Sequence, residues 1–234
     1  MHYIFTFACL AFSVSAASGP KLNTSFASVQ GTFSHKSEWV QNCNFDRWPQ
    51  PPGLPTIAVA NNLYEGAGYC GVCAEVKAAQ STTGPRKVGI INTRCADCPN
   101  NSLNIAPELW NAIVPANAQK VIPGRALIDW KVVPCPLTTK MVLIGKKGSA
   151  PGWLALQVAS AKLPIESVKI QAKHSLRVIP LVRQNYNFFT LPQGTTLSGN
   201  LIDVLVTCTN TKSVMFVDVP YKDKDLFMTG LSNC

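Results

Sequence analysis

The feature that most constrains the fold is a series of short apolar or alternating segments, separated about every ten to fifteen residues by Gly, Pro, Asn and Ser. Segments of this length suit β-strands and are too short for most helices. Strands are expected at 73–77, 87–92, 126–133, 154–158, 167–172, 177–182, 201–207 and 214–219. Helices are expected only at 55–64 and at 107–114, where Pro107 suits a first helical position. The chain is therefore predicted to be mainly β.

The chain begins with a segment that is typical of a secretory signal. Residues 3–12 are largely apolar, and Ser13, Val14, Ser15 and Ala16 supply the small residues expected at a cleavage site, although no Lys or Arg precedes the apolar run. No later run has the eighteen or more apolar residues that a membrane span needs. Residues 1–16 are thus predicted to be a signal peptide, and the protein to be secreted, extracellular or in the cell wall.

A domain boundary is predicted at Pro134-Cys135-Pro136, because the two prolines prevent the strand at 126–133 from continuing its pairing. About 218 residues remain after the signal, which is more than most single domains contain. We therefore expect two domains, at 17–135 and 136–234.

The cysteines indicate disulfides. Of the nine in the sequence, Cys9 lies in the predicted signal, which leaves an even number of eight in an oxidising compartment. The alternative is a zinc site, because Cys70 with Cys73 and Cys95 with Cys98 have the spacing of four thiolate ligands. Secretion favours four disulfides, so neither a metal nor another cofactor is expected.

The net charge is 21 minus 12, or +9. A basic secreted protein attracts acidic wall polysaccharides, although the charge is equally compatible with a general role in solubility. Nucleic acid is not an expected partner outside the cell. Asn23 and Asn100 begin N-glycosylation patterns, so the protein is predicted to be a glycoprotein, and a glycan on Asn100 would crowd the groove described below.

Several segments, taken in order, resemble one family. They are GTFS at 31–34, YEG at 64–66, GYCGVC at 68–73, NIAPELW at 104–110 and DWKVVPCP at 129–136 in the first half, and GSAPGWLALQV at 148–158 and YNFF at 186–189 in the second. This set is similar to that of expansins and expansin-like proteins, and it covers nearly all of the chain after the signal. The resemblance implies a six-stranded double-psi β-barrel at 17–135, followed by an immunoglobulin-like, carbohydrate-binding β-sandwich at 136–234.

The same resemblance implies a pairing of the cysteines. It implies the pairs Cys43 with Cys70 and Cys73 with Cys135, and the cysteines that then remain are expected to pair as Cys95 with Cys98 and Cys208 with Cys234.

The family's groove uses a Thr near the start of the barrel and two Asp residues, with an aromatic residue beside the first Asp. Thr32 matches the Thr, but Thr93 and Asn104 stand at the Asp positions and Cys95 at the aromatic position. Acid catalysis of glycoside hydrolysis needs a carboxylic acid, and neither Thr nor Asn can supply one. The protein is therefore predicted to be non-hydrolytic.

Asp97 is the carboxylate nearest to Thr93 in the sequence, and a shifted alignment would make it a substitute acid. Its place between Cys95 and Cys98 favours an ordinary solvated turn residue.

In the second half, strand alternation suggests a sugar-binding surface. If Leu154, Leu156 and Val158 face the core, Trp153, Ala155, Gln157 and Ala159 face solvent. The family has three aromatic platforms in a row; Trp153 and Tyr186 match two of them, and Gly152 stands at the third. The alternatives are that Trp153 packs under the domain linker and that Tyr186 fills the core. Lys146 and Lys147 precede the platform and either contact the glycan or belong to a solvated turn.

Other residues fit simpler roles. His35 and His174 have no Ser or Cys partner at a recognisable spacing, so a nucleophilic triad is not expected. The remaining tryptophans are expected to pack in the core or between domains, with Trp48 also a candidate for the groove rim: Trp39, Trp48, Trp110 and Trp130.

The leading interpretation is a secreted, monomeric, non-hydrolytic expansin-like protein that binds cellulose, another β-glucan or an acidic matrix polymer. Loss of the second acid leaves wall loosening open. The alternatives are an endoglucanase related to barrel-type cellulases and a barwin-like or structural matrix protein that binds glycans.

Overall fold

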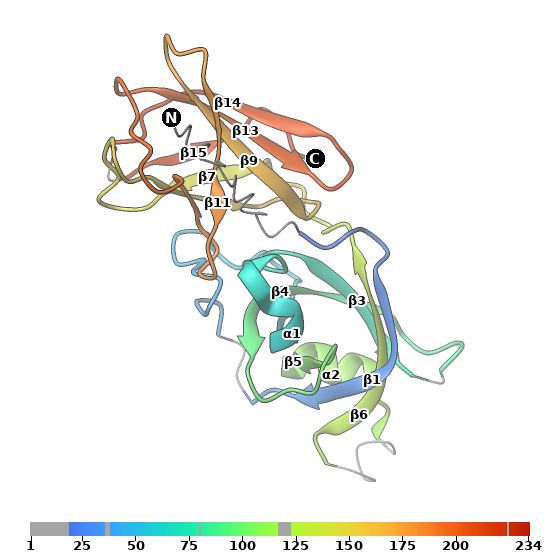
Figure 1. Cartoon of the computed structure of the whole chain (residues 1–234). Coiled ribbons are helices and arrows are strands. Elements are labelled where there is room, and N and C mark those ends of the chain that lie inside the picture. Colours follow the sequence, from blue (N-terminus) through green and yellow to red (C-terminus); the bar gives the residue numbers. More distant parts are fainter. Residues whose placement is uncertain (1–18, 36–37, 80, 117–122, 224) are drawn as a thin grey trace, which may run out of the picture.

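The computed structural model describes residues 19–35, 38–79, 81–116, 123–223 and 225–234, which form two β-rich bodies (Figure 1). The predicted signal at 1–16, with Cys9, lies outside the described residues. Among the described residues, no helix is both long and apolar enough to cross a membrane.

The first body is a closed barrel whose six strands follow the order β1-β5-β2-β4-β3-β6. Their bounds are β1 (Ser25–Phe33), β2 (Thr56–Ala60), β3 (Cys73–Ala78), β4 (Lys87–Cys95), β5 (Leu103–Ile105) and β6 (Arg125–Val133). The pairs β1–β5 and β2–β4 are parallel, and antiparallel pairing of β1 with β6 closes the barrel. Closure leaves the sheet without an unpaired edge.

The short helices of the barrel are α1 (Asn61–Tyr64), η1 (Glu65–Ala67) and α2 (Pro107–Ile113). The helix predicted at 107–114 is confirmed, and it buries Leu109, Trp110 and Ile113. The helix predicted at 55–64 is wrong over its first part, because Thr56–Ala60 is the barrel strand β2. Three of its residues are β-branched and buried in the barrel, which favours a strand over a helix.

The second body is a sandwich of two sheets, ordered β10-β9-β13-β14 and β11-β12-β8-β7-β15. The strands are β7 (Val142–Gly145), β8 (Ala155–Ala159), β9 (Ile165–Ala172), β10 (Val178–Pro180), β11 (Val182–Arg183), β12 (Phe189–Thr190), β13 (Ile202–Cys208), β14 (Ser213–Val219) and β15 (Phe227–Thr229). One buried apolar cluster includes residues of both sheets, among them Leu156, Val168, Val204 and Phe216. The predicted fold class, a barrel followed by a sandwich, is confirmed.

One predicted strand, at 177–182, is divided between the two sheets. Val178–Pro180 pairs with β9, whereas Val182–Arg183 pairs with β12. Leu181, between them, is buried in the core of the sandwich.

The four expected disulfides are present: Cys43–Cys70, Cys73–Cys135, Cys95–Cys98 and Cys208–Cys234. The thiols that had the spacing of a zinc site are therefore engaged in bridges.

The barrel covers the outer face of the five-stranded sheet. Val142, Ile144 and Ala159 on that sheet belong to the same buried apolar cluster as the barrel core. The expectation that Ala155, Gln157 and Ala159 face solvent is therefore wrong, and all three are buried. Strand alternation placed them on the correct face, but that face is a domain interface.

Polar contacts also cross this interface. Arg47 of the barrel donates to the main-chain oxygens of Gly145 (3.1 Å), Leu226 (3.2 Å) and Asp225 (2.8 Å). Arg183 of the sandwich donates to the oxygen of Ala67 in the barrel at 3.1 Å, and burial lowers the pKa of Arg183 to about 10.

The domain boundary predicted at 134–136 stays a prediction. The last barrel strand ends at Val133, and β7 begins at Val142.

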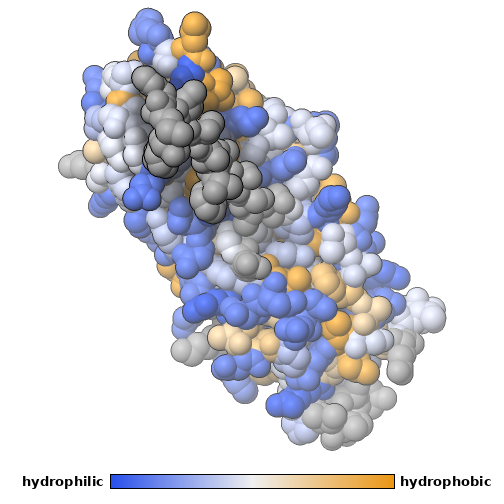
Figure 2. Space-filling model, in the orientation of Figure 1, coloured by the Kyte–Doolittle hydropathy of each residue, from blue (hydrophilic) through white to orange (hydrophobic). Residues whose placement is uncertain are grey.

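Figure 2 shows hydrophilic residues spread over both bodies on the face in view, with the hydrophobic surface residues in separate groups.

Candidate functional site

Strand register brings the predicted groove residues together on the barrel. Thr32 is paired with Asn104, Asn104 with Ala58, and Ala58 with Thr93, across four neighbouring strands. Residues paired in this way point to the same face of a sheet. The neighbours of Ala58 in β2 are buried, whereas Ala58 itself is partly exposed, so the row lies on the outer face. This row forms the floor of the groove, with the small residue Ala58 between Asn104 and Thr93.

The polar members of this row are held by hydrogen bonds. The Asn104 Nδ2 donates to the Thr32 Oγ1 at 2.8 Å, so two of the predicted positions are in direct contact. The Thr93 Oγ1 donates to the Asn42 Oδ1 at 2.7 Å. These groups are neutral donors and acceptors, which suits them to hydroxyl groups rather than to proton transfer.

The segment 38–44 forms a wall beside this floor. Asn92 is 1% exposed, and its Nδ2 donates to the main-chain oxygens of Glu38 (2.8 Å) and Trp39 (2.9 Å). The disulfide of Cys43 with Cys70 anchors the other end of the segment. Trp39, Phe45 and Trp48 pack against one another, and Trp48 is buried.

Between the wall and the floor lies a hollow of about 310 Å³, the barrel hollow. It is lined by Ser34, Glu38, Gln41, Asn42, Thr56, Ala58, Asn92, Thr93, Arg94, Cys95, Asn104 and Ala106. Within this described lining Glu38 is the one carboxylate, and its Oε2 accepts from the Gln41 Nε2 at 2.6 Å. The usual mechanism of glycoside hydrolysis uses a pair of carboxyl groups, and this described lining supplies one.

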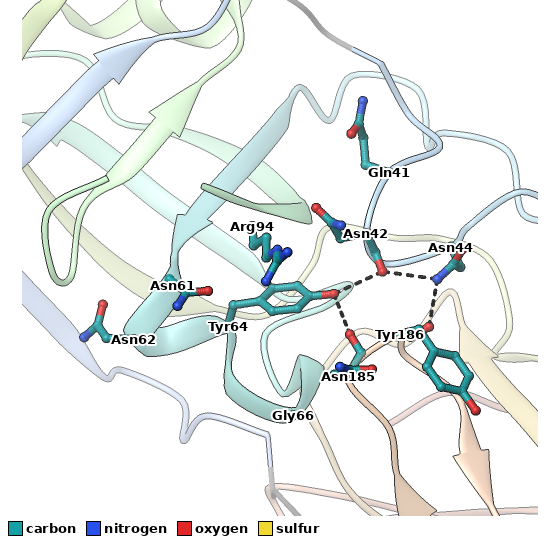
Figure 3. A pocket seen from close by; sticks show the side chains of 10 residues that line it. All are labelled: Gln41, Asn42, Asn44, Asn61, Asn62, Tyr64, Gly66, Arg94, Asn185 and Tyr186. Carbon is teal, nitrogen blue, oxygen red and sulfur yellow. Dashed lines mark hydrogen bonds between the residues drawn. The ribbon is translucent and has the colours of Figure 1, made fainter. Parts of the chain in front are cut away.

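A larger hollow of about 690 Å³, the junction hollow, lies where the barrel meets the sandwich (Figure 3). Its lining comes from both domains: Gln41, Asn42, Asn44, Asn61, Asn62, Tyr64, Gly66, Arg94, Asn185 and Tyr186. The two hollows share Gln41, Asn42 and Arg94, so they form one groove that runs from the barrel floor to the sandwich.

Tyr64 links the two domains at this junction. Its hydroxyl lies within hydrogen-bond distance of the main-chain oxygens of Asn42 (3.0 Å) and Asn185 (2.9 Å), one from each domain (Figure 3). The Asn44 Nδ2 similarly donates to the main-chain oxygen of Tyr186 at 3.0 Å. Burial raises the pKa of Tyr64, and the nearby Arg94 only partly opposes this shift. Tyr64 is therefore neutral at physiological pH.

The predicted sandwich residues fall into two groups. Tyr186 is partly exposed and lines the junction hollow, and the Lys146 Nζ lies 5.9 Å from the centre of its ring. Trp153 is 40% exposed in a turn where it pairs with Ala150, and Lys147 is exposed in the turn after β7. Of the four predicted sandwich residues, only Tyr186 belongs to the described lining of the junction hollow; Lys146, Lys147 and Trp153 do not.

One sequence candidate, Asp97, and the two histidines for which no catalytic role was expected lie outside the groove lining described above. Asp97 is exposed in the turn closed by the Cys95–Cys98 bridge. His35 lies with Thr32 in a separate hollow of about 620 Å³, and His174 is exposed after β9. Trp110 and Trp130 are buried in the barrel core, as expected.

Sequence reasoning missed Glu38, Arg94 and Tyr64 as groove residues. Arg94 stands next to Thr93, but strand alternation assigns neighbours to opposite faces. Glu38 is distant in sequence from the floor, and only the fold of its segment brings it there.

We compared the chain with known proteins. No protein-family profile matches the chain. It is 24% identical over 207 residues to "Expansin-like protein 3" of Dictyostelium discoideum, an alignment that covers 82% of this chain and 58% of that protein. It is also 24% identical to "Expansin-like protein 5" of the same organism, over 63% of this chain and 62% of that protein. The chain thus spans about three fifths of these relatives.

Solved structures show the same fold. The apo form of the Clavibacter michiganensis expansin superposes with a TM-score of 0.72 at 22% identity, covering 88% of this chain and 96% of that one. A substituted form of that expansin, in complex with cellohexaose, gives the same TM-score at 23% identity and the same coverage. The resemblance to expansin-like proteins is confirmed, and the chain has the two-domain expansin fold.

Proposed function

We propose that this expansin-like protein is secreted and binds cell-wall polysaccharide along the groove, without cleaving it. The observation that carries this proposal is the neutral row of Thr32, Asn104 and Thr93: Asn104 and Thr93 line a groove that continues to the sandwich, and Thr32 extends the row beside Asn104. Amides and hydroxyls both donate and accept hydrogen bonds, so they can contact sugar hydroxyls at many points. None of the three floor side chains can act as the acid that glycoside hydrolysis requires.

Two further observations support a polysaccharide as the ligand. The solved expansin with the same fold was crystallised with cellohexaose, a β-glucan oligomer. In this chain Tyr186 lies at the sandwich end of the groove and Trp153 presents an exposed ring on the same domain. Aromatic rings provide a flat apolar surface on which a sugar ring can stack.

The test is a set of binding isotherms on cellulose, soluble β-glucan and pectin, with newly formed reducing ends measured in parallel. We expect retention on at least one polymer, no release of reducing ends, and weaker retention for Trp153→Ala. Retention that is unchanged by this substitution would remove Trp153 from the site. Reducing ends that disappear with Glu38→Gln or Asp97→Asn would instead identify an endoglucanase.

Wall loosening is tested by restoring the second acid. The Asn104 Nδ2 now donates to the Thr32 Oγ1 at 2.8 Å; in Asn104→Asp this bond reverses, because the new carboxylate can only accept from the Thr32 hydroxyl. We expect the variant to increase creep of a wall strip under constant load by several-fold. Asn200→Asp, which adds the same charge at an exposed position of the sandwich, is the control. Equal creep for both variants would contradict a role for position 104, and creep already present in the unmodified protein would show loosening without the acid.

A further inference from the structure

The junction hollow carries an unbalanced positive charge. Its described lining contains six amide side chains, two tyrosines and one glycine, and Arg94 is its one charged residue. Burial keeps Tyr64 protonated, so its hydroxyl does not offset the guanidinium. The floor position beside Arg94 is Thr93, which is also neutral, and Glu38, the one carboxylate of the described groove lining, borders the barrel hollow and not the junction hollow.

Arg94 is also not engaged in an ion pair with the side chains that the structure describes. The described ion pairs involve Lys77, Arg86, Lys131 and Lys173. Arg94 is exposed and borders both hollows, and Figure 3 shows its side chain next to the Tyr64 ring. A guanidinium in this position is accessible to a ligand that lies along the groove.

A second cation, Lys146, lies beside Tyr186, although Lys146 itself is not part of the described lining of the junction hollow. The exposed Lys146 lies with its Nζ 4.9 Å from the ring centre of Phe188 and 5.9 Å from that of Tyr186. A chain that runs from Arg94 along the amides of the hollow and past Tyr186 would therefore approach a second positive charge, at Lys146.

We propose that the groove selects a polysaccharide that carries carboxylates, a polyuronide, and that Arg94 binds one of these carboxylates. This inference rests on the proposed function and narrows its ligand class. A guanidinium forms two parallel hydrogen bonds to a carboxylate, which gives both strength and orientation. The surrounding amides can bind the ring hydroxyls, and the repeating charge of a polyuronide can reach Lys146 as well. A neutral glucan uses the amides but leaves Arg94 without an anion.

The experiment measures the binding of three oligosaccharides of equal length by calorimetry: an oligogalacturonate, its methyl ester, and a cello-oligosaccharide. The methyl ester retains the chain but removes its charge. We expect the acid to bind tightest, with an affinity that falls as salt rises. In Arg94→Gln the affinity for the acid should fall on the order of tenfold, the loss of one charge-assisted contact, with the methyl ester unaffected.

Arg177→Gln is the matched control, because Arg177 is exposed on the sandwich and the same charge is lost. Equal losses in both variants would overturn the inference and assign the effect to net charge. Equal affinity for the acid and its ester would also overturn it. If the cello-oligosaccharide binds and Arg94→Gln has no effect, the inference fails while the proposed function stands; if no polysaccharide binds, both fail.

Discussion

Gln157 shows how one buried side chain joins the two domains. Its Nε2 donates at 3.0 Å to the main-chain oxygens of Cys43 and Asn44, both in the wall of the groove. The Asn187 Nδ2 donates to the same Cys43 oxygen at 3.0 Å. The sandwich thus fixes the main chain of the wall at the junction hollow.

Gln157→Leu is expected to destabilise the protein by about 1–3 kcal/mol, because the substitution leaves the Asn44 oxygen buried without this donor. Gln157 Oε1 has no partner among the described groups, so removing it offsets part of the cost. Urea unfolding measures the change. Gln171→Leu in β9 of the four-stranded sheet, which removes only a local bond to the Ser175 main-chain oxygen, should cost less. Equal costs would contradict a special role for the interface amide.

At the scale of elements, a β-bulge between β13 and β14 is held by charged groups. The pairing shifts between Ile202 and Val204, and Asp218 in the opposite strand has a φ of 56°. The Asp203 Oδ1 accepts from the Asp218 main-chain N–H at 2.9 Å, and the Lys173 Nζ lies 3.0 Å from Asp203 and 2.8 Å from Asp218. The Asp218 N–H and then Lys173 hold the pKa of Asp203 below its ordinary value, against the effect of burial.

This bulge predicts a pH dependence of stability. A carboxyl whose pKa is lowered in the folded state contributes stability above its unfolded pKa of about 3.9, and loses it as the pH falls through the folded value. Asp203→Asn should therefore lower Tm at pH 7 by roughly 1–3 °C, and the difference should close below about pH 3.9. Thermal unfolding from pH 2.5 to 7 tests this. A constant difference across that range would contradict the assignment to the charge, and Asp97→Asn in an exposed turn is the control.

The elements that the sequence predicted best are those with a strong local signal. Pro107 marked the start of α2, and alternation located most long strands to within two or three residues. The short strands β5, β12 and β15 have too few residues for a pattern, and the alternating but polar β1 was also missed. The apolar run at 55–64 is compatible with a buried strand and with a buried helix, so periodicity alone could not distinguish the two.

The candidate site was predictable only in part. Thr32, Thr93 and Asn104 were placed by the resemblance, and strand register brings them together. Glu38 and Asn185 reach the groove through loops, whose paths no local pattern fixes. The covered face of β8 depends on how two domains pack, which the alternation of a single strand cannot show.

At the scale of the whole molecule, the groove depends on how the domains dock. Gln41, Asn42, Tyr64 and Arg94 come from the barrel, whereas Asn185 and Tyr186 come from the sandwich. Separation of the domains would therefore leave the barrel hollow in place but remove the junction hollow. Arg47, with its three bonds to sandwich carbonyls, is the barrel side chain with the most contacts of this kind among the described hydrogen bonds.

Arg47→Ala is expected to loosen docking by about 2–3 kcal/mol, because it removes charge-assisted bonds and leaves three carbonyls without this donor. Small-angle scattering should show a larger radius of gyration, while circular dichroism stays that of folded β domains. Affinity for a polysaccharide that spans the junction hollow should fall, although Arg47 does not line it. Arg177→Ala, on the exposed surface of the sandwich, should change neither quantity. If Arg47→Ala weakens binding without any change in the radius of gyration, docking is not the cause, and the other polar and apolar contacts are sufficient to hold the domains together.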